Sequence, residues 1–268
     1  MEKLGKIKNA FVDYQTHEDL YLPKIYGKPR EEDLLPLDLE QLGWDTPVFG
    51  ALFDLYPGIC LIIEVGSWKG CSAIRMAKDL LKRGRSDFKI ICIDTWLGSR
   101  MDYKRFPPRG TPQKSGTMPR TEGGNPSLFN IFVSNIVREG VDEYIEPLML
   151  PSTEAYHYIK EQNAPHEKLF EGSKLTSGDQ LRDLTSQVKD APKISPDLIY
   201  VDASHEYECV YQDISLYWKL LRNGGILLGD DYCKWQPGVV KAVEEFSKEI
   251  KKPIQTHTAT NKWWIIKN

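Results

Sequence analysis

The chain has 268 residues, of which 41% are hydrophobic and 27% charged, with a formal net charge of −3 at pH 7. This apolar content is enough for a buried core and excludes a chain that is disordered throughout. The slightly acidic balance argues against a nucleic-acid partner, because dedicated nucleic-acid binders are usually basic. No run of about 18 apolar residues is present, so no membrane insertion is expected.

Five cysteines are present, and no two of them form a CxxC pair. Their spacing argues against a zinc ribbon or a thioredoxin-like redox site. The first nine residues are charged and lack the apolar stretch of a secretory signal. An odd number of cysteines without such a signal favours a reducing compartment, and we expect a cytoplasmic protein.

Residues 1–44 are polar and interrupted by prolines, and we expect them to form an extension packed on the core. Apolar side chains recur at helical spacing over residues 47–56, which predicts an amphipathic helix. A short apolar run at residues 60–65 then predicts a buried strand. We expect residues 45–268 to form one domain that begins with these elements.

A glycine-rich turn, a helix and a second strand follow the first strand directly. The turn is formed by residues 66–70, the helix is predicted over residues 73–81, and the second strand over residues 89–94. This order predicts a βαβ unit, in which the two strands run parallel.

The rest of the chain continues the alternation of strands and helices, apart from two polar segments. Residues 97–125 are rich in proline and glycine and carry six basic residues against two acidic ones, which predicts a mobile loop. Residues of about 160–195 are polar and predict an insertion. Helices are predicted at residues 128–138, 210–221 and 239–250. Strands are predicted at residues 145–150, 196–202, 225–230 and 262–266. We therefore expect an α/β fold with a Rossmann-like, doubly wound sheet, whose ligands lie at the carboxyl ends of the strands.

The turn after the first strand combines a carboxylate with two glycines. Glu64 precedes Gly66, and Gly70 closes a GxxxG spacing rather than a GxGxxG motif. Glycine lets the backbone turn sharply and approach a ligand. A carboxylate at this place would repel a pyrophosphate and suits a cationic or hydroxyl-rich ligand. A tight turn without any ligand is the alternative interpretation.

The second strand ends at Asp94. An acidic residue at this distance from the glycine-rich turn commonly binds the hydroxyls of a ribose. Capping of the next segment is the alternative role for Asp94. Trp96 suits either stacking on an adenine or a place in the core.

Acidic residues and a histidine follow the next two strands of the predicted sheet. Asp202 and His205 follow one strand, and Asp230 and Asp231 follow the other. Three converging carboxylates repel one another unless a hard divalent cation binds them, which predicts a Mg²⁺ site. His205 is then placed to act as a general base. A helix cap at Asp231 and a structural role for His205 are the alternatives.

Four segments in this order carry a resemblance to a known family: Glu64-Val-Gly66-Ser-Trp-Lys-Gly70, Ile93-Asp94-Thr-Trp96, Tyr200-Val-Asp202-Ala-Ser-His205 and Gly229-Asp230-Asp231-Tyr232. Over residues 44–266 the chain resembles the class I S-adenosylmethionine-dependent methyltransferases. More narrowly, it resembles their metal-dependent small-molecule and sugar O-methyltransferase branch, which includes the sugar methyltransferases of macrolide biosynthesis. The resemblance implies a mostly parallel sheet of about seven strands, the last antiparallel, with helices on both faces.

The resemblance also implies a set of functional residues and two cofactors, S-adenosylmethionine and Mg²⁺ or another divalent cation. It implies that His205 takes the proton from the acceptor hydroxyl, that Glu64 faces the ammonium group of the methyl donor, and that Asp94 binds its ribose. The implied metal ligands are Asp202, Asp230 and Asp231. The residues implied in cofactor binding are Glu64, Gly66, Ser67, Trp68, Gly70, Asp94, Thr95, Trp96, Ser152 and Asp202.

Several functions stay open at this point. The leading hypothesis is methyl transfer to a sugar hydroxyl, with the sugar free, nucleotide-linked or part of a glycan. A catechol-like phenol also presents two adjacent oxygens and remains an alternative acceptor. The missing GxGxxG motif and Glu64 disfavour an NAD-dependent oxidoreductase, and the clustered carboxylates disfavour a non-catalytic scaffold. A homo-oligomer is compatible with the sequence.

Overall fold

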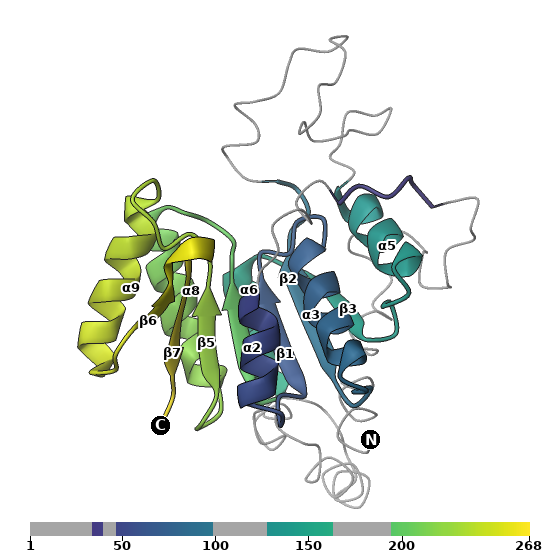
Figure 1. Ribbon diagram of the computed structural model, residues 1–268. Helices are drawn as coiled ribbons and strands as arrows, with labels where there is room; N and C mark the ends of the chain where they lie inside the picture. Colours follow the sequence, from purple (N-terminus) through teal and green to yellow (C-terminus); the bar gives the residue numbers. More distant parts are fainter. Residues whose placement is uncertain (1–33, 40–46, 99–127, 163–193) are drawn as a thin grey trace, which may run out of the picture.

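The computed structural model describes residues 34–39, 47–98, 128–162 and 194–268 of the chain. One sheet lies between two layers of helices (Figure 1). The helices are α2 (Pro47–Leu55), α3 (Cys71–Lys82), α5 (Leu128–Arg138), α6 (Ser152–Gln162), α8 (Tyr207–Leu220) and α9 (Pro237–Ile250), with a short 3₁₀ turn η3 (Thr258–Thr260). The strands are β1 (Leu61–Val65), β2 (Lys89–Asp94), β3 (Ile145–Met149), β4 (Leu198–Val201), β5 (Ile226–Gly229), β6 (Gln255–His257) and β7 (Lys262–Ile266).

The strands of the described residues form one seven-stranded sheet in the order β3-β2-β1-β4-β5-β7-β6. Strands β1 to β5 pair in parallel, whereas β7 is antiparallel to both β5 and β6. The predicted doubly wound sheet with an antiparallel last strand is therefore confirmed. The strand order reverses between β1 and β4, and folds of this kind bind ligands at the carboxyl ends beside that reversal.

The predicted elements agree with the structure to within about three residues, the usual uncertainty of element ends. Two elements were not predicted individually, α6 and β6. Only part of α6 is apolar, with Ala155, Tyr156 and Ile159 buried. Strand β6 has three polar residues at the sheet edge. Neither element has the strong hydrophobic period that sequence reading depends on.

Each face of the sheet has its own hydrophobic core. Along β1, Ile63 and Val65 belong to the core beneath α6, α8 and α9, while Ile62 belongs to the core beneath α2, α3 and α5 (Figure 1). This alternation is the two-residue period of a strand. All five side chains of β1 are buried because helices cover both faces. Full burial of each large aliphatic side chain stabilises the fold by about 1.5–3 kcal/mol.

A buried carboxylate joins β1 and β4 at the amino ends of the two strands. Asp197 Oδ2 accepts hydrogen bonds from the backbone N–H groups of Cys60 (2.9 Å) and Leu61 (2.8 Å), and the carboxylate also pairs with Arg222. Burial acts to raise the pKa of Asp197, but these donors together outweigh it and lower the pKa. The contact fixes β1 against β4 at the end of the sheet opposite to the predicted ligand site.

Residues 34–39 lie against α5. The Leu35 N–H donates to Ser134 Oγ (2.9 Å), and the Asp38 N–H donates to Asn135 Oδ1 (3.0 Å). The Asp38 carboxylate also pairs with Lys69 at 2.7 Å. These contacts tie a short part of the expected extension to the core. The rest of residues 1–44 and most of the segments predicted as a mobile loop and an insertion lie outside the described residues; α6 includes residues 160–162.

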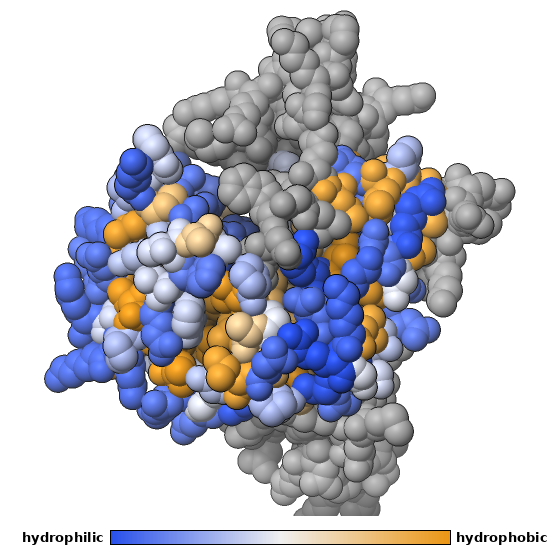
Figure 2. All heavy atoms as spheres, in the orientation of Figure 1, coloured by the Kyte–Doolittle hydropathy of each residue, from blue (hydrophilic) through white to orange (hydrophobic). Residues whose placement is uncertain are grey.

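The surface around α2 combines apolar and polar areas. Figure 2 shows hydrophobic side chains gathered beside α2, with hydrophilic side chains around them. Leu55, at the end of α2, is among the exposed large hydrophobic residues of the described chain. No helix in the described part of the chain is long and apolar enough to cross a membrane.

Candidate functional site

Asp94, the last residue of β2, binds the backbone of the glycine-rich turn after β1. Asp94 Oδ2 accepts the backbone N–H groups of Ser67 (3.0 Å) and Trp68 (2.9 Å), and Oδ1 accepts that of Trp96 (2.7 Å). Burial raises the pKa of Asp94, although these N–H groups act in the opposite direction. Asp94 therefore fixes the conformation of the turn through these hydrogen bonds. Binding of a ribose would be an additional role.

Gly66 brings the turn into close contact with the segment after β4. Its φ of 89° is in the left-handed region, and a Cβ atom there would lie 2.4 Å from Ala203 Cα and from the Asp202 carbonyl oxygen. A side chain at this position is excluded both by backbone strain and by this contact. Gly66 thus joins the two parts of the predicted site, which are far apart in the sequence.

Glu64 is fully buried in β1, and its carboxylate is engaged within the protein. It accepts hydrogen bonds from the Ser72 hydroxyl, at the start of α3, and from Cys92 Sγ at 3.3 Å. Burial raises the pKa of Glu64, and the nearby Ser67, Ser72 and Cys92 groups partly oppose this increase. Glu64 therefore supports the start of α3 from beneath, whereas the resemblance implies a direct contact with the cationic group of a ligand.

Ser67 carries a buried hydroxyl that lies close to Glu64 and Cys92. The side chain is 2% exposed, and its Oγ is the one buried side-chain polar atom of the described residues with no hydrogen bond of normal geometry. A buried hydroxyl without a well-formed hydrogen bond costs free energy. Its place in the turn after β1 leaves it available to a polar ligand.

Trp96, the aromatic residue of the turn after β2, belongs to the core. The Trp96 indole is 2% exposed, lies 5.0 Å from the Phe129 ring and 4.8 Å from the Phe132 ring, and donates its Nε1–H to the Trp68 carbonyl oxygen. This packing favours the core interpretation of Trp96 over stacking on an adenine. Gly70 faces the same aromatic group, since a Cβ atom there would lie 2.9 Å from the Phe132 ring.

Two further predicted cofactor residues have local hydrogen-bond partners. The Thr95 hydroxyl accepts the Leu97 N–H at 3.3 Å within its own turn. The Ser152 hydroxyl, at the start of α6, donates to Asp213 Oδ1 at 2.6 Å. Burial raises the pKa of Asp213 to about 6, and the bond from Ser152 acts against that increase. Ser152 therefore connects α6 to α8 at the carboxyl end of β3.

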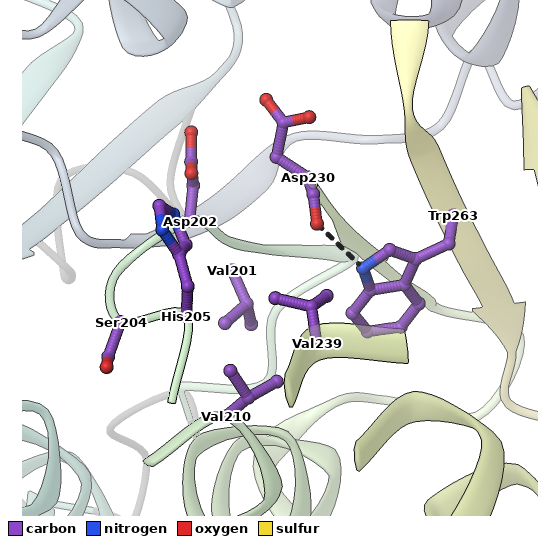
Figure 3. A pocket seen from close by; sticks show the side chains of 8 residues that line it. All are labelled: Val201, Asp202, Ser204, His205, Val210, Asp230, Val239 and Trp263. Carbon is purple, nitrogen blue, oxygen red and sulfur yellow. Dashed lines mark hydrogen bonds between the residues drawn. The ribbon is translucent and has the colours of Figure 1, made fainter. Parts of the chain in front are cut away.

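The segments that follow β4 and β5 bring three functional groups together. His205 Nε2 lies 2.7 Å from Asp231 Oδ2, and one ligand atom from each of Asp202, His205 and Asp231 lies within 4.8 Å of the other two. Figure 3 shows the His205 ring next to Asp202, with Val201, Val210 and Val239 beneath them. Sequence reasoning predicted this meeting of strand ends.

The electrostatics of this group follow from its burial and its crowded carboxylates. The contact with Asp231 raises the pKa of His205, and burial acts in the opposite direction. Burial and the neighbouring Asp230 charge raise the pKa of Asp202 to about 7, while the charge of Lys262 acts to lower it. A protonated histidine or a bound cation would relieve the repulsion between these acids.

Asp230 has a different environment, because a lysine from the last strand reaches it. Lys262 Nζ forms an ion pair with Asp230 Oδ2 and donates to the Tyr200 hydroxyl at 2.6 Å. The Tyr200 hydroxyl lies 3.1 Å from both Asp202 Oδ2 and Asp230 Oδ2. A buried positive charge therefore lies beside the three carboxylates whose mutual repulsion predicted the cation site.

The position of Lys262 near the site could have been predicted from the sequence. Lys262 begins the apolar run of β7, which pairs antiparallel with β5 through Gly229 and Trp263. An antiparallel last strand beside β5 places its first residue next to the carboxyl end of β5. A charged residue at the start of an otherwise apolar strand could therefore have been assigned to the site.

The residues after β4 and β5 fit a divalent cation. Two carboxylates and an imidazole, whose ligand atoms lie within 4.8 Å of one another, form a donor set of the kind that binds metal ions. Carboxylate oxygens are preferred ligands of Mg²⁺, and the imidazole widens the choice to transition metals. Asp202 and Asp231 would supply these oxygens, and the Asp230 side chain points to the same side as that of Asp202 (Figure 3).

Comparison with known proteins identifies the type of domain. A family model described as a methyltransferase domain matches residues 63–232, which is more than half of the chain. A curated relative, an uncharacterized protein of Acanthamoeba polyphaga mimivirus, is 36% identical over 56 residues. That alignment covers 20% of this chain and 25% of the relative, so it spans about a quarter of the relative's length.

Solved structures align with this chain at low sequence identity. The O-methyltransferase NovP aligns with a TM-score of 0.50 and 15% identity, over 85% of this chain and 79% of its own. An O-methyltransferase from Bacillus cereus, solved in complex with SAH, aligns with a TM-score of 0.48 and 13% identity, over 98% of this chain and 91% of its own. At such identities the likeness concerns the arrangement of strands and helices.

Proposed function

The chain belongs to the methyltransferase-domain family, and on this premise we propose that it transfers a methyl group from S-adenosylmethionine to a hydroxyl oxygen of a small-molecule or glycan acceptor. One observation carries the proposal. Asp202, His205 and Asp231 meet at the carboxyl ends of β4 and β5, and the Gly66 turn touches this segment directly. A site for a methyl donor and a site for removing a proton are thereby placed side by side.

His205 is the proposed general base. Asp231 holds the Nε2 edge of its ring at 2.7 Å and favours the imidazolium that forms when His205 accepts a proton from the acceptor hydroxyl. Asp–His pairs orient the imidazole in this way in many enzymes. The same contact explains why the pKa of His205 is raised, and a stronger base removes the proton more effectively.

The turn after β1 is the proposed binding site of the methyl donor, which supplies an electrophilic methyl group when bound. The Ser67 hydroxyl and the backbone of residues 66–70 would bind its amino-acid part, and the start of α3 points to the same place. Asp94 and Thr95 would contact the ribose of the methyl donor, and Ser152 would contact its adenine base. Glu64 would act from beneath the turn by holding Ser72.

A divalent cation, Mg²⁺ by preference, is proposed at Asp202 and Asp231. Such an ion is a Lewis acid that lowers the pKa of a bound hydroxyl. Asp202 keeps its carboxylate near Asp231 and His205, so the protein holds oxygen ligands and a base at one place. The position of these carboxylate oxygens is the reason for proposing a divalent cation here.

The proposed acceptor is a sugar hydroxyl, with a catechol-like phenol as the alternative. The motif resemblance to sugar O-methyltransferases supports the first, because all four segments that carry it surround the described site. Two vicinal oxygens serve either acceptor at a divalent cation. We further propose a cytoplasmic protein, supported by the odd number of cysteines. The boundary of the catalytic domain at residue 45 is also a proposal.

A calorimetric titration with S-adenosylhomocysteine, with and without Mg²⁺, is the first test. Binding in the micromolar range is expected, and no binding in either condition would contradict the assignment of the turn after β1. Methyl transfer from labelled S-adenosylmethionine is then measured with sugar and catechol acceptors. Loss of activity in EDTA, restored by Mg²⁺, is expected; equal activity in EDTA would contradict the cation site.

A further inference from the structure

We propose that Lys262 supplies a fixed positive charge that neutralises Asp230. Asp230 is then not a ligand of the divalent cation, which Asp202 and Asp231 bind. The inference rests on the proposed function and specifies which carboxylates act as ligands. It makes Lys262 a positioning residue, since it acts through Asp230 and Tyr200.

The carboxylate of Asp230 is occupied by donors from the protein itself. Oδ1 accepts the Asp231 N–H at 2.7 Å, and Oδ2 faces both the Tyr200 hydroxyl and the Lys262 ammonium. The side chain of Lys262 is 4% exposed, so its charge is withdrawn from water. A buried charge that loses its partner is strongly destabilising, and this pair is correspondingly hard to separate.

The surroundings of Lys262 keep it at Asp230. Its Nζ atom lies 4.9 Å from the centre of the Tyr200 ring and 5.7 Å from that of Phe49, both of which are buried. Aromatic faces attract an ammonium group but do not neutralise it. In such a low-dielectric place the attraction between opposite charges is strong. Asp230 is therefore the carboxylate to which Lys262 is bound.

Tyr200 extends this arrangement to Asp202. A hydroxyl group has one proton to donate, and Tyr200 receives a hydrogen bond from Lys262 at 2.6 Å. Because Lys262 already donates to Asp230, the Tyr200 proton is available to Asp202 Oδ2 at 3.1 Å. Lys262 thus orients two carboxylates, one directly and one through Tyr200.

The charges of the site balance with this assignment. The carboxylates of Asp202, Asp230 and Asp231 carry −3 in total when ionised, and Lys262 adds +1, which leaves −2. One divalent cation brings the sum to zero. Without Lys262 the site has one more uncompensated carboxylate, which would attract a divalent cation more strongly.

The test measures Mn²⁺ binding by electron paramagnetic resonance on the full chain, without methyl donor or acceptor. Asp231→Asn is expected to weaken Mn²⁺ binding at least about tenfold, whereas Asp230→Asn is expected to leave it within about threefold of the unchanged protein. Lys262→Met is expected to strengthen binding at least about tenfold, because it releases Asp230. The double variant Lys262→Met with Asp230→Asn is expected to return to the original affinity.

Each outcome decides the proposal. Equal losses in Asp230→Asn and Asp231→Asn would show Asp230 to be a ligand and would overturn it. A folded Lys262→Met variant with unchanged or weaker binding would overturn it as well, since a lysine that neutralises Asp230 must oppose cation binding while it is present. If Lys262→Met does not fold, the comparison of the two aspartate variants decides. If the unchanged protein binds no Mn²⁺, the cation part of the proposed function fails, and Lys262→Met decides the role of Lys262 by gaining binding or not.

Discussion

His205 and Asp231 follow two different strands, and the 2.7 Å contact between Nε2 and Oδ2 joins them. His205→Ala is expected to lower turnover by about 10²-fold or more, because the proton of the acceptor then has no base. The Mn²⁺ affinity of the His205→Ala variant is expected to stay unchanged. This result would distinguish a general base from a metal ligand, since loss of a ligand weakens Mn²⁺ binding. Steady-state kinetics and Mn²⁺ titration check both points.

The matched control is His157→Ala, which removes an exposed histidine on α6. It is expected to leave turnover unchanged. A His205→Ala variant that keeps near-normal turnover would remove His205 from the mechanism, and a joint loss of Mn²⁺ binding would assign it to the cation instead.

Asp197 acts at the other end of the sheet, where it binds two backbone N–H groups and Arg222. Asp197→Ala is expected to lower the free energy of unfolding by about 1–3 kcal/mol, because it leaves the buried Leu61 N–H without its partner and removes the partly exposed bonds to the Cys60 N–H and Arg222. Chemical denaturation measures this value. Asp54→Asn, which alters an exposed ion pair with Arg83, is the control and is expected to leave stability unchanged.

The lowered pKa of Asp197 also gives its contribution a pH dependence. The folded state holds the ionised form, so the stabilisation is complete above the unfolded pKa of about 3.9. It is lost as the pH falls through the folded pKa, which lies below that value. The difference in unfolding free energy between the unchanged protein and Asp197→Asn is therefore expected to shrink on acidification below about pH 4, and a constant difference would contradict this origin.

At the scale of elements, the start of α9 sets the position of His205. A Cβ atom at Gly238 would lie 2.4 Å from the His205 carbonyl oxygen and 2.9 Å from the Tyr207 N atom. Gly238→Ala is expected to displace the segment after β4 and to lower turnover by about tenfold or more, since small misplacements of a catalytic group are costly. Affinity for S-adenosylhomocysteine is expected to remain, as measured by calorimetry.

Gly58→Ala is the matched control for this variant. Gly58 lies between α2 and β1, and a Cβ atom there would meet nothing within 4 Å. Turnover is expected to be normal in this variant. Normal turnover in a folded Gly238→Ala variant as well would show that the contact with α9 does not position His205.

At the scale of the whole molecule, ligand binding is expected to raise the unfolding temperature. A ligand at 100 times its dissociation constant stabilises the folded state by about 2.7 kcal/mol if it binds only that state. S-adenosylhomocysteine is expected to do so, and NAD at the same concentration is not. Thermal unfolding followed by circular dichroism measures both. Stabilisation by NAD alone would support the oxidoreductase alternative and contradict the proposed methyl donor.

Much of the architecture was predictable because its causes are local. The apolar runs of β1, β2, β4 and β5 predict buried strands, and the residues that end them predict a site at the carboxyl edge. A parallel sheet brings such edges together, so the proximity of Asp202 and Asp231 followed from topology alone. The weakly patterned α6 and the polar, three-residue β6 gave no such signal.

The sequence by itself determined the fold class, the order of the predicted elements and the group of strand-end residues, because strand periodicity and glycine turns are encoded within a few neighbouring positions. Tertiary structure alone decided which partner each of these residues has. Asp94 binds the turn of β1, Glu64 lies beneath α3, and Lys262 reaches Asp230 from a strand 32 residues later in the chain. Such pairings depend on strand order and side-chain direction, which no local pattern specifies.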